Sequence, residues 1–213
     1  MRRVTGPIDL DAPDAGARAI DVLGTVDAAV DGAVVLAACA AIVRHRPAGA
    51  VRVLRAAAPK LTSPRARRAC VAAIVRLGED ALLVEIAHAL RSSDSAVVLG
   101  AARVLGDVCD PRAVPNLIEA LRTDDPAVFA AVAHALGQIN DPVCVPWLVA
   151  AVDHGFCVEV ACRALGALGD ARAKDALVRV KAGPDRARAL AAAEALVLIE
   201  EAACGQGGEG GEG

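Results

Sequence analysis

A repeat with a period of about 31 residues runs through most of this chain and constrains its fold more than any other feature. Residues 94–121 read DSAVVLGAARVLGDVCDPRAVPNLIEAL, and residues 125–152 read DPAVFAAVAHALGQINDPVCVPWLVAAV. The two copies share, at matching positions, Asp, Ala-Val, Leu-Gly, Asp-Pro, Val-Pro and Leu. A third copy covers 156–180 after a shift of 29, whereas 63–90 and 31–54 keep a looser form of the pattern. A unit this short cannot bury a core alone, so the copies are expected to stack.

Each copy contains two helical stretches with recognisable start and stop signals. A capping residue begins the first stretch, where its side-chain oxygen can accept hydrogen bonds from free backbone amides. These residues are Asp31, Ser63, Asp94, Asp125 and Asp153. The glycines Gly106, Gly137 and Gly166 are expected to loosen the end of the first stretch. Asp110-Pro111 and Asp141-Pro142 then turn the chain into the second stretch.

The pattern predicts an all-α fold, an α-solenoid or α-α superhelix of about six antiparallel helix pairs. No alternating β-branched run with hairpin turns interrupts it. We expect the solenoid to cover residues 15–204, after an N-terminal extension at 1–14. Residues 205–213, GQGGEGGEG, are predicted to be a disordered tail because they have nothing to bury.

Composition supports a globular chain whose helices are packed from small residues. Apolar residues make up 55% of the sequence and the net charge is -3, but the aromatics are one Trp and two Phe. No apolar run reaches the roughly 18 residues of a membrane span, and no export signal begins the chain, so a cytoplasmic location is expected. The seven cysteines lie mostly on apolar helix faces without a CxxC pair. They are predicted to be reduced, buried thiols, with a metal or disulfide role as the alternative.

The pattern V-x-x-x-A-x-x-A-L-G-x-[IL]-x-D-P-x-A-V-P-x-L resembles HEAT repeats of the phycobilisome-lyase-like type. Residues 97–117 and 157–177 carry it best, and the resemblance covers about 63–181. It implies a solenoid but leaves function open, because chromophore lyases, regulatory scaffolds and many bacterial proteins share this repeat. Members of the family usually have Arg after the first Val of each copy, where this chain has Val98, Phe129 and Val158. An exposed apolar strip is therefore expected to replace a ladder of charges.

No catalytic, cofactor or metal site is predicted. The four histidines, His45, His88, His134 and His154, occupy unrelated places in the repeat. None is followed by Glu, although deoxyhypusine hydroxylases, HEAT-repeat enzymes of similar fold, bind iron through paired His-Glu motifs. The chain also lacks a Gly-rich phosphate loop and a nucleophile elbow. We therefore expect a protein that is not an enzyme.

A block of basic residues without any acid is the first candidate binding feature. Its members are Arg44, Arg46, Arg52, Arg55, Lys60, Arg65, Arg67, Arg68 and Arg76. The segments on either side are net acidic, so this block could attract acidic protein groups or a phosphate backbone. Alternatively, these residues solubilise several helices or pair with acids of neighbouring repeats. Nucleic acid is the less favoured ligand, because no aromatic residue within the block could stack on a base.

The aromatic residues are the second candidate feature, since Phe129, Trp147 and Phe156 all fall within one stretch. Phe129 stands at the repeat position where the family usually has Arg, and Trp147 stands where the preceding copy has Asn116. Both positions are therefore expected to be at least partly exposed. They either anchor a protein partner or fill gaps between Ala-rich helices. The favoured function is a scaffold or adaptor that binds a protein or peptide through these aromatics, Val98 and Val158, with the basic block holding acidic groups. The alternatives are a phycobilin-lyase-like enzyme or enzyme subunit, and a nucleic-acid binder.

Overall fold

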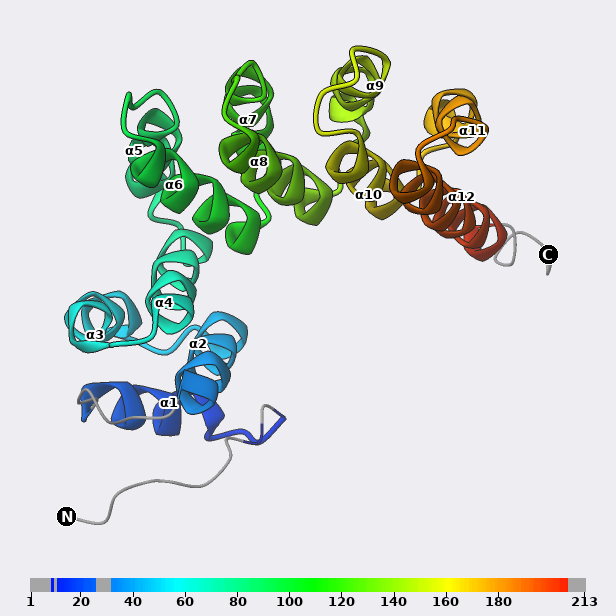
Figure 1. The fold of residues 1–213 in the computed structure, drawn as a ribbon. Helices are drawn as coiled ribbons and strands as arrows, with labels where there is room; N and C mark the ends of the chain where they lie inside the picture. Colours follow the sequence, from blue (N-terminus) through cyan, green and yellow to red (C-terminus); the bar gives the residue numbers. More distant parts are fainter. Residues whose placement is uncertain (1–8, 10, 26–31, 207–213) are drawn as a thin grey trace. The chain divides into compact units, whose positions relative to one another are not determined.

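The computed structural model describes residues 9, 11–25 and 32–206 (Figure 1). This part of the chain contains twelve α-helices and no β-strand, which confirms the all-helical prediction. It divides into two compact units, unit 1 at residues 1–86 and unit 2 at residues 87–213. Helix α5 (Asp80–Ala89) spans the boundary between them. The predicted disordered tail at 205–213 is wrong for its first two residues, because α12 continues to Gln206. Residues 207–213 and much of the predicted N-terminal extension lie outside the described residues.

Unit 1 is built from two helix pairs. Its helices are α1 (Ala15–Gly24), α2 (Gly32–His45), α3 (Ala50–Ala57) and α4 (Pro64–Arg76). Helix α1 packs against α2 and α3 against α4, while α2 also packs against α4 and α1 against α3. The core between them is made of Ala, Val, Leu, Ile and two Cys side chains. Small residues allow this close packing, as the composition predicts.

The described part of unit 2 is built from seven complete helices. Its helices are α6 (Ser95–Val108), α7 (Val114–Ala120), α8 (Pro126–Ile139), α9 (Val145–Asp153), α10 (Val158–Leu168), α11 (Lys174–Lys181) and α12 (Arg186–Gln206). The even-numbered helices α6, α8, α10 and α12 pack in succession, while α7, α9 and α11 lie against α8, α10 and α12 (Figure 1). Each packed pair therefore joins the second stretch of one sequence copy to the first stretch of the next.

The turns between stretches repeat with the sequence. Asp110, Asp141 and Asp170 each accept a hydrogen bond of 2.9 Å from the backbone N–H two residues later. A short 3-10 turn follows each aspartate, at Pro111–Ala113, Pro142–Cys144 and Ala171–Ala173. The residue before each aspartate, Cys109, Asn140 or Gly169, has a left-handed backbone that ends the helix. The predicted Asp-Pro turns are thus confirmed.

The predicted helix caps are confirmed at three positions and wrong at one. The side chains of Ser63, Asp94 and Asp125 accept hydrogen bonds from the first turns of α4, α6 and α8. Asp153 is instead the last residue of α9, because α10 begins only at Val158. The third copy is shifted by 29 rather than 31 residues, and this shortening displaces the cap. Asp31 lies outside the described residues.

The repeated glycines were expected to loosen the ends of helices. They lie instead within α6, α8 and α10. A Cβ atom at Gly106 would lie 3.1 Å from the Cα atom of Ala135 in α8. At Gly137 it would lie 3.4 Å from the Cβ atom of Ala167 in α10. The missing side chain at Gly106 therefore lets α6 and α8 approach closely, whereas a Cβ atom at Gly137 would make only ordinary van der Waals contact.

Candidate partner-binding site

The expected apolar strip is not on the surface. Val98, Phe129 and Val158 are only 5%, 2% and 5% exposed. The prediction that these three places are exposed was therefore wrong. Burial of an apolar side chain stabilises the folded state. The apolar residues at the position where the family has Arg therefore extend the core between the helices.

Phe129 and Phe156 form an aromatic pair in which Phe129 is buried and Phe156 is partly buried. Their ring centroids are 5.2 Å apart and their planes meet at 85°, an edge-to-face arrangement. Phe156 lies in the turn between α9 and α10, between Gly155 and Cys157, both of which have positive φ. This turn carries Phe156 to the Phe129 ring on α8. For these two residues, gap filling is the interpretation that the structure favours.

Trp147 is the aromatic residue that stays at the surface. It lies in the first turn of α9 and is 41% exposed. The guanidinium carbon of Arg122, which follows α7, lies 5.3 Å from the centroid of the indole ring. This is cation–π geometry, and it holds the indole against the neighbouring repeat. Val143, four residues before Trp147, is 61% exposed.

The repeat explains why Arg122 contacts an indole. One period earlier, Arg91 pairs with Glu119 at 3.0 Å. In the next copy the counterparts of Arg91 and Glu119 are Arg122 and Ala150, so the acidic residue of the pair is missing there. Among the described residues Arg122 forms no ion pair, and its guanidinium group contacts the indole ring of Trp147 instead. Arg122 therefore lacks the ion pair between repeats that Arg91 forms with Glu119.

The following copy again has an ion pair at these two positions, but the acidic and basic residues are exchanged. Asp153 at the end of α9 pairs with Arg179 of α11 at 2.6 Å. Position 179 corresponds to Ala150 and to Glu119 in the two preceding copies. The row of charged contacts along α7, α9 and α11 is thus interrupted at Arg122.

A pocket of about 370 Å³ adjoins this interruption. Arg91 and Arg122 line it together with Glu119. Its other polar lining side chains are Ser92, Ser93, Ser95, Asn116 and Thr123. Arg122 therefore belongs both to the pocket and to the contact with Trp147. We call Arg122, Val143, Trp147 and this pocket the Trp147 site.

A second hollow of about 310 Å³ lies between α8 and α10. Its lining includes His134 and Gln138 on α8 and Arg163 on α10, around Gly137 and several alanines. Arg163 also lies 3.7 Å from Glu159, one turn before it on the same helix. The floor of this hollow is formed by small residues, and its cation already has an acidic neighbour.

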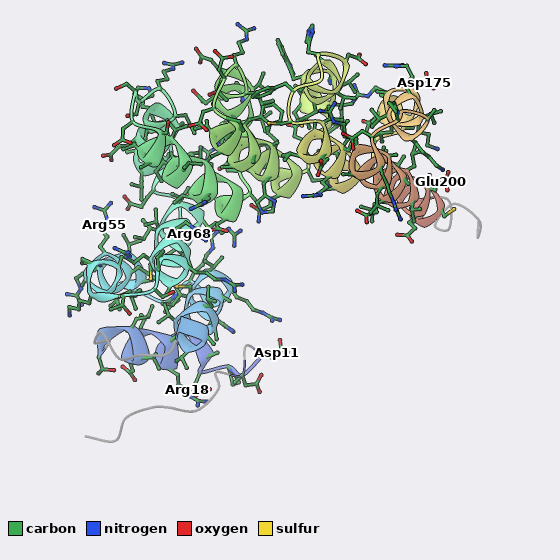
Figure 2. The ribbon with its side chains drawn as sticks, in the orientation of Figure 1. Asp11, Arg18, Arg55, Arg68, Asp175 and Glu200 are labelled. Carbon is green, nitrogen blue, oxygen red and sulfur yellow. The ribbon has the colours of Figure 1, made fainter. Side chains whose placement is uncertain are left out.

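The basic block does not form a single row of free charges. Its residues come from α2, α3, α4 and the turns between them in unit 1, and Figure 2 labels Arg55 and Arg68 on the adjacent helices α3 and α4. Arg44 pairs with Asp11 at 2.7 Å and Arg55 with Glu79 at 2.8 Å. Arg46 donates a hydrogen bond to the backbone oxygen of Arg76. These contacts favour the interpretation that part of the block stabilises unit 1, and anion binding by the block stays a prediction.

The cysteines agree with the sequence in four of seven cases. Cys39, Cys70, Cys144 and Cys162 are buried, whereas Cys157 is partly exposed. Cys109 and Cys204 are exposed, so the prediction of burial was wrong for them. Burial raises the pKa of Cys144 and of Cys162 to about 11 in each case. All seven are free thiols in this structure.

No three side chains of His, Cys, Asp or Glu come together within residues 9, 11–25 and 32–206 in a way that could hold a metal ion. No helix there is long and apolar enough to span a membrane.

Comparison with known proteins identifies the repeat. Residues 82–156 match the family of HEAT repeats. No curated protein sequence matches the chain. Among solved structures, human deoxyhypusine hydroxylase in complex with glycerol is similar, with a TM-score of 0.52 and 21% sequence identity. The alignment covers 87% of this chain and 75% of that one. At this identity the similarity shows the helical-repeat fold alone.

Proposed function

We propose that this protein is a non-enzymatic HEAT-repeat scaffold that binds a protein or peptide partner at the Trp147 site. The observation that carries the proposal is the interruption at Arg122. An exposed indole and a cation without an acidic partner lie together beside a pocket lined by hydroxyl and amide groups. Exposed Trp and Arg side chains of this kind are typical anchors of protein interfaces.

The chemistry of the site indicates what part of a partner it fits. A carboxylate of the partner would occupy the place that Glu119 takes one repeat earlier and would neutralise Arg122. An aliphatic or aromatic side chain would cover the exposed edge of Trp147 and the neighbouring Val143. The partner segment therefore combines one acidic with one apolar side chain.

The experiment begins with partners recovered from the native host by the full-length chain and identified by mass spectrometry. Each candidate is then purified and titrated against the wild-type chain and three variants. Because Trp147 is the only tryptophan and the chain has no tyrosine, intrinsic fluorescence reports directly on this site. Binding is expected to change the emission and to reduce quenching of Trp147 by acrylamide.

Three variants separate the contributions of the site. Trp147→Ala, followed with a labelled partner, is expected to weaken binding about 10- to 100-fold, as loss of an interface anchor does. Ala150→Glu restores the acid of the repeat, which would pair with Arg122 and also weaken binding. Val178→Ala is the matched control, because Val178 is an exposed apolar residue on α11 outside the site. Equal affinity of the wild type and Trp147→Ala for every purified partner would rule the site out.

The two alternative functions predict different observations with the same protein. A phycobilin-lyase-like role, suggested by the resemblance in the repeat, requires a change in visible absorbance when a bilin is added. Nucleic-acid binding by the block at 44–76 requires retention on a filter that weakens steeply with rising salt. The scaffold proposal expects neither.

A further inference from the structure

The only two cysteines of residues 1–86 meet inside unit 1. The Sγ atoms of Cys39 in α2 and Cys70 in α4 are 3.7 Å apart. Their side chains are 4% and 0% exposed. The two positions are 31 residues apart, close to one repeat period, and α2 packs directly against α4. The repeat therefore brings neighbouring positions of successive helices into contact.

The surroundings of this pair permit a covalent bond. Ala38, Ala66 and Ala73 belong to the same buried cluster, so the two helices meet through small side chains. A disulfide requires the sulfurs to approach to about 2.05 Å, which side-chain rotation and a small helix shift can supply from a starting contact like this one. We propose that Cys39 and Cys70 are an oxidation site at which a two-electron oxidant such as hydrogen peroxide closes a disulfide between α2 and α4. This inference concerns unit 1 and is independent of the Trp147 site.

The reaction balances with peroxide as the oxidant. The contact with Cys39 lowers the pKa of Cys70, while the same contact and burial raise the pKa of Cys39. With Cys39 as the hydrogen-bond donor of the pair, the Cys70 thiolate attacks a peroxide oxygen, the O–O bond breaks, and hydroxide leaves. The sulfur of Cys39 then attacks the resulting sulfenic acid, its S–O bond breaks, and the oxygen leaves as water with the proton of Cys39. In total, two thiols and one peroxide give one disulfide and two waters.

Burial determines how this site differs from the exposed thiols. The first step is slow compared with oxidation of Cys109, because peroxide must reach a sulfur inside unit 1. The second step is fast, because the resolving thiol is already in contact. Further oxidation of Cys70 to sulfinic acid is therefore suppressed as long as Cys39 is present.

The test uses the full-length chain with Cys109→Ser and Cys204→Ser, which removes the exposed thiols and their intermolecular disulfides. After peroxide treatment, tryptic mapping without reduction is expected to show a peptide linking Cys39 to Cys70, and dithiothreitol should separate it again. The cross-link closes a loop through α3 and should raise the midpoint of thermal unfolding of unit 1 by about 5–10 °C.

Cys70→Ala in the same background is the matched control. Alanine stands at the equivalent place of α6, as Ala101, so the substitution suits the fold. This variant should gain no thermal stability on oxidation, and Cys39→Ala should expose Cys70 to sulfinic acid formation. Free thiols at Cys39 and Cys70 after a peroxide treatment long enough to oxidise the equally buried Cys144 and Cys162 would overturn the proposal. So would sulfinic acid forming at Cys70 as fast with Cys39 as without it.

Discussion

A Cβ atom added to Gly166 in α10 would lie 2.8 Å from the Cα atom of Ala195 in α12. Carbon atoms do not approach this closely without displacement, so the two helices meet backbone to backbone at this point. A side chain would push against main chain rather than against a flexible side-chain end. Of the three repeated glycines, Gly166 therefore lies closest to the backbone of the next helix.

Gly166→Ala is expected to lower the free energy of unfolding by about 1–3 kcal/mol, because α10 and α12 must separate to admit the methyl group. Gly100→Ala is the matched control. It adds the same methyl group in α6 where nothing lies within 4 Å. It should raise the free energy of unfolding by up to about 1 kcal/mol through helix propensity alone. Urea titrations followed by circular dichroism measure both changes, and an equal gain in the two variants would contradict the backbone contact.

The different burial of two aromatic residues gives a second prediction. Phe129→Ala removes a fully buried ring and its contact with Phe156, so it should cost about 3–5 kcal/mol of unfolding free energy. Trp147→Ala removes a half-exposed ring and should cost less than about 1.5 kcal/mol. Denaturant titration of the two variants provides the comparison. A larger loss for Trp147→Ala would mean that Trp147 is a core residue and not a binding anchor.

The repeat made most of the fold predictable from the sequence. Apolar spacing located the helices, and the Asp-Pro pairs located the turns after Gly106 and Gly137. The purpose of these glycines could not be predicted, because a glycine near a helix end suggests a stop signal, whereas only the neighbouring helix reveals a close contact. The cap at Asp153 failed for a similar reason. A two-residue shortening changes which residue begins a helix without changing the apolar pattern that reveals the repeat.

The candidate site was predicted only in part. Trp147 was expected at the surface and lies there, but Phe129 was placed by analogy with the family's Arg and turned out to be core. An equivalent position in the repeat does not have the same burial when an apolar side chain replaces a charged one. Arg122 was missed, although a signal existed. Aligning the copies places Ala150 opposite Glu119, and the loss of one acid from a repeated ion pair marks the cation left behind.

Thiol accessibility provides a third prediction. In the native protein at pH 8, iodoacetamide should alkylate the exposed Cys109 and Cys204 first. Cys144 and Cys162 should remain unmodified, because they are buried and a pKa of about 11 leaves roughly one thiolate in a thousand at that pH. Peptide mapping before and after unfolding in urea measures the difference. Alkylation of Cys144 or Cys162 at the rate of Cys204 in the folded protein would contradict the packing of α9 and α10.

The turns at Asp110 and Asp170 predict how stability depends on pH. Hydrogen bonds from the side chains of Arg112 and Arg172 hold the pKa of each carboxyl below its ordinary value of 3.8. In the unfolded chain both carboxyls titrate near that ordinary value. Their contribution is therefore complete above about pH 4 and is lost as the pH falls towards the lower folded pKa, because the unfolded state takes up protons first.

Replacement by asparagine isolates this contribution, because the amide oxygen can still accept the backbone hydrogen bond of the turn while the charge pair with arginine is lost. The double variant Asp110→Asn, Asp170→Asn should be less stable than the wild type at pH 6. The loss should be below about 1 kcal/mol for each pair, since both guanidiniums are well exposed. The difference should shrink as the pH is lowered from 4 to 2 in urea titrations. A difference that stays constant across this range would mean that the charges contribute nothing and that the turn is held by its backbone hydrogen bonds alone.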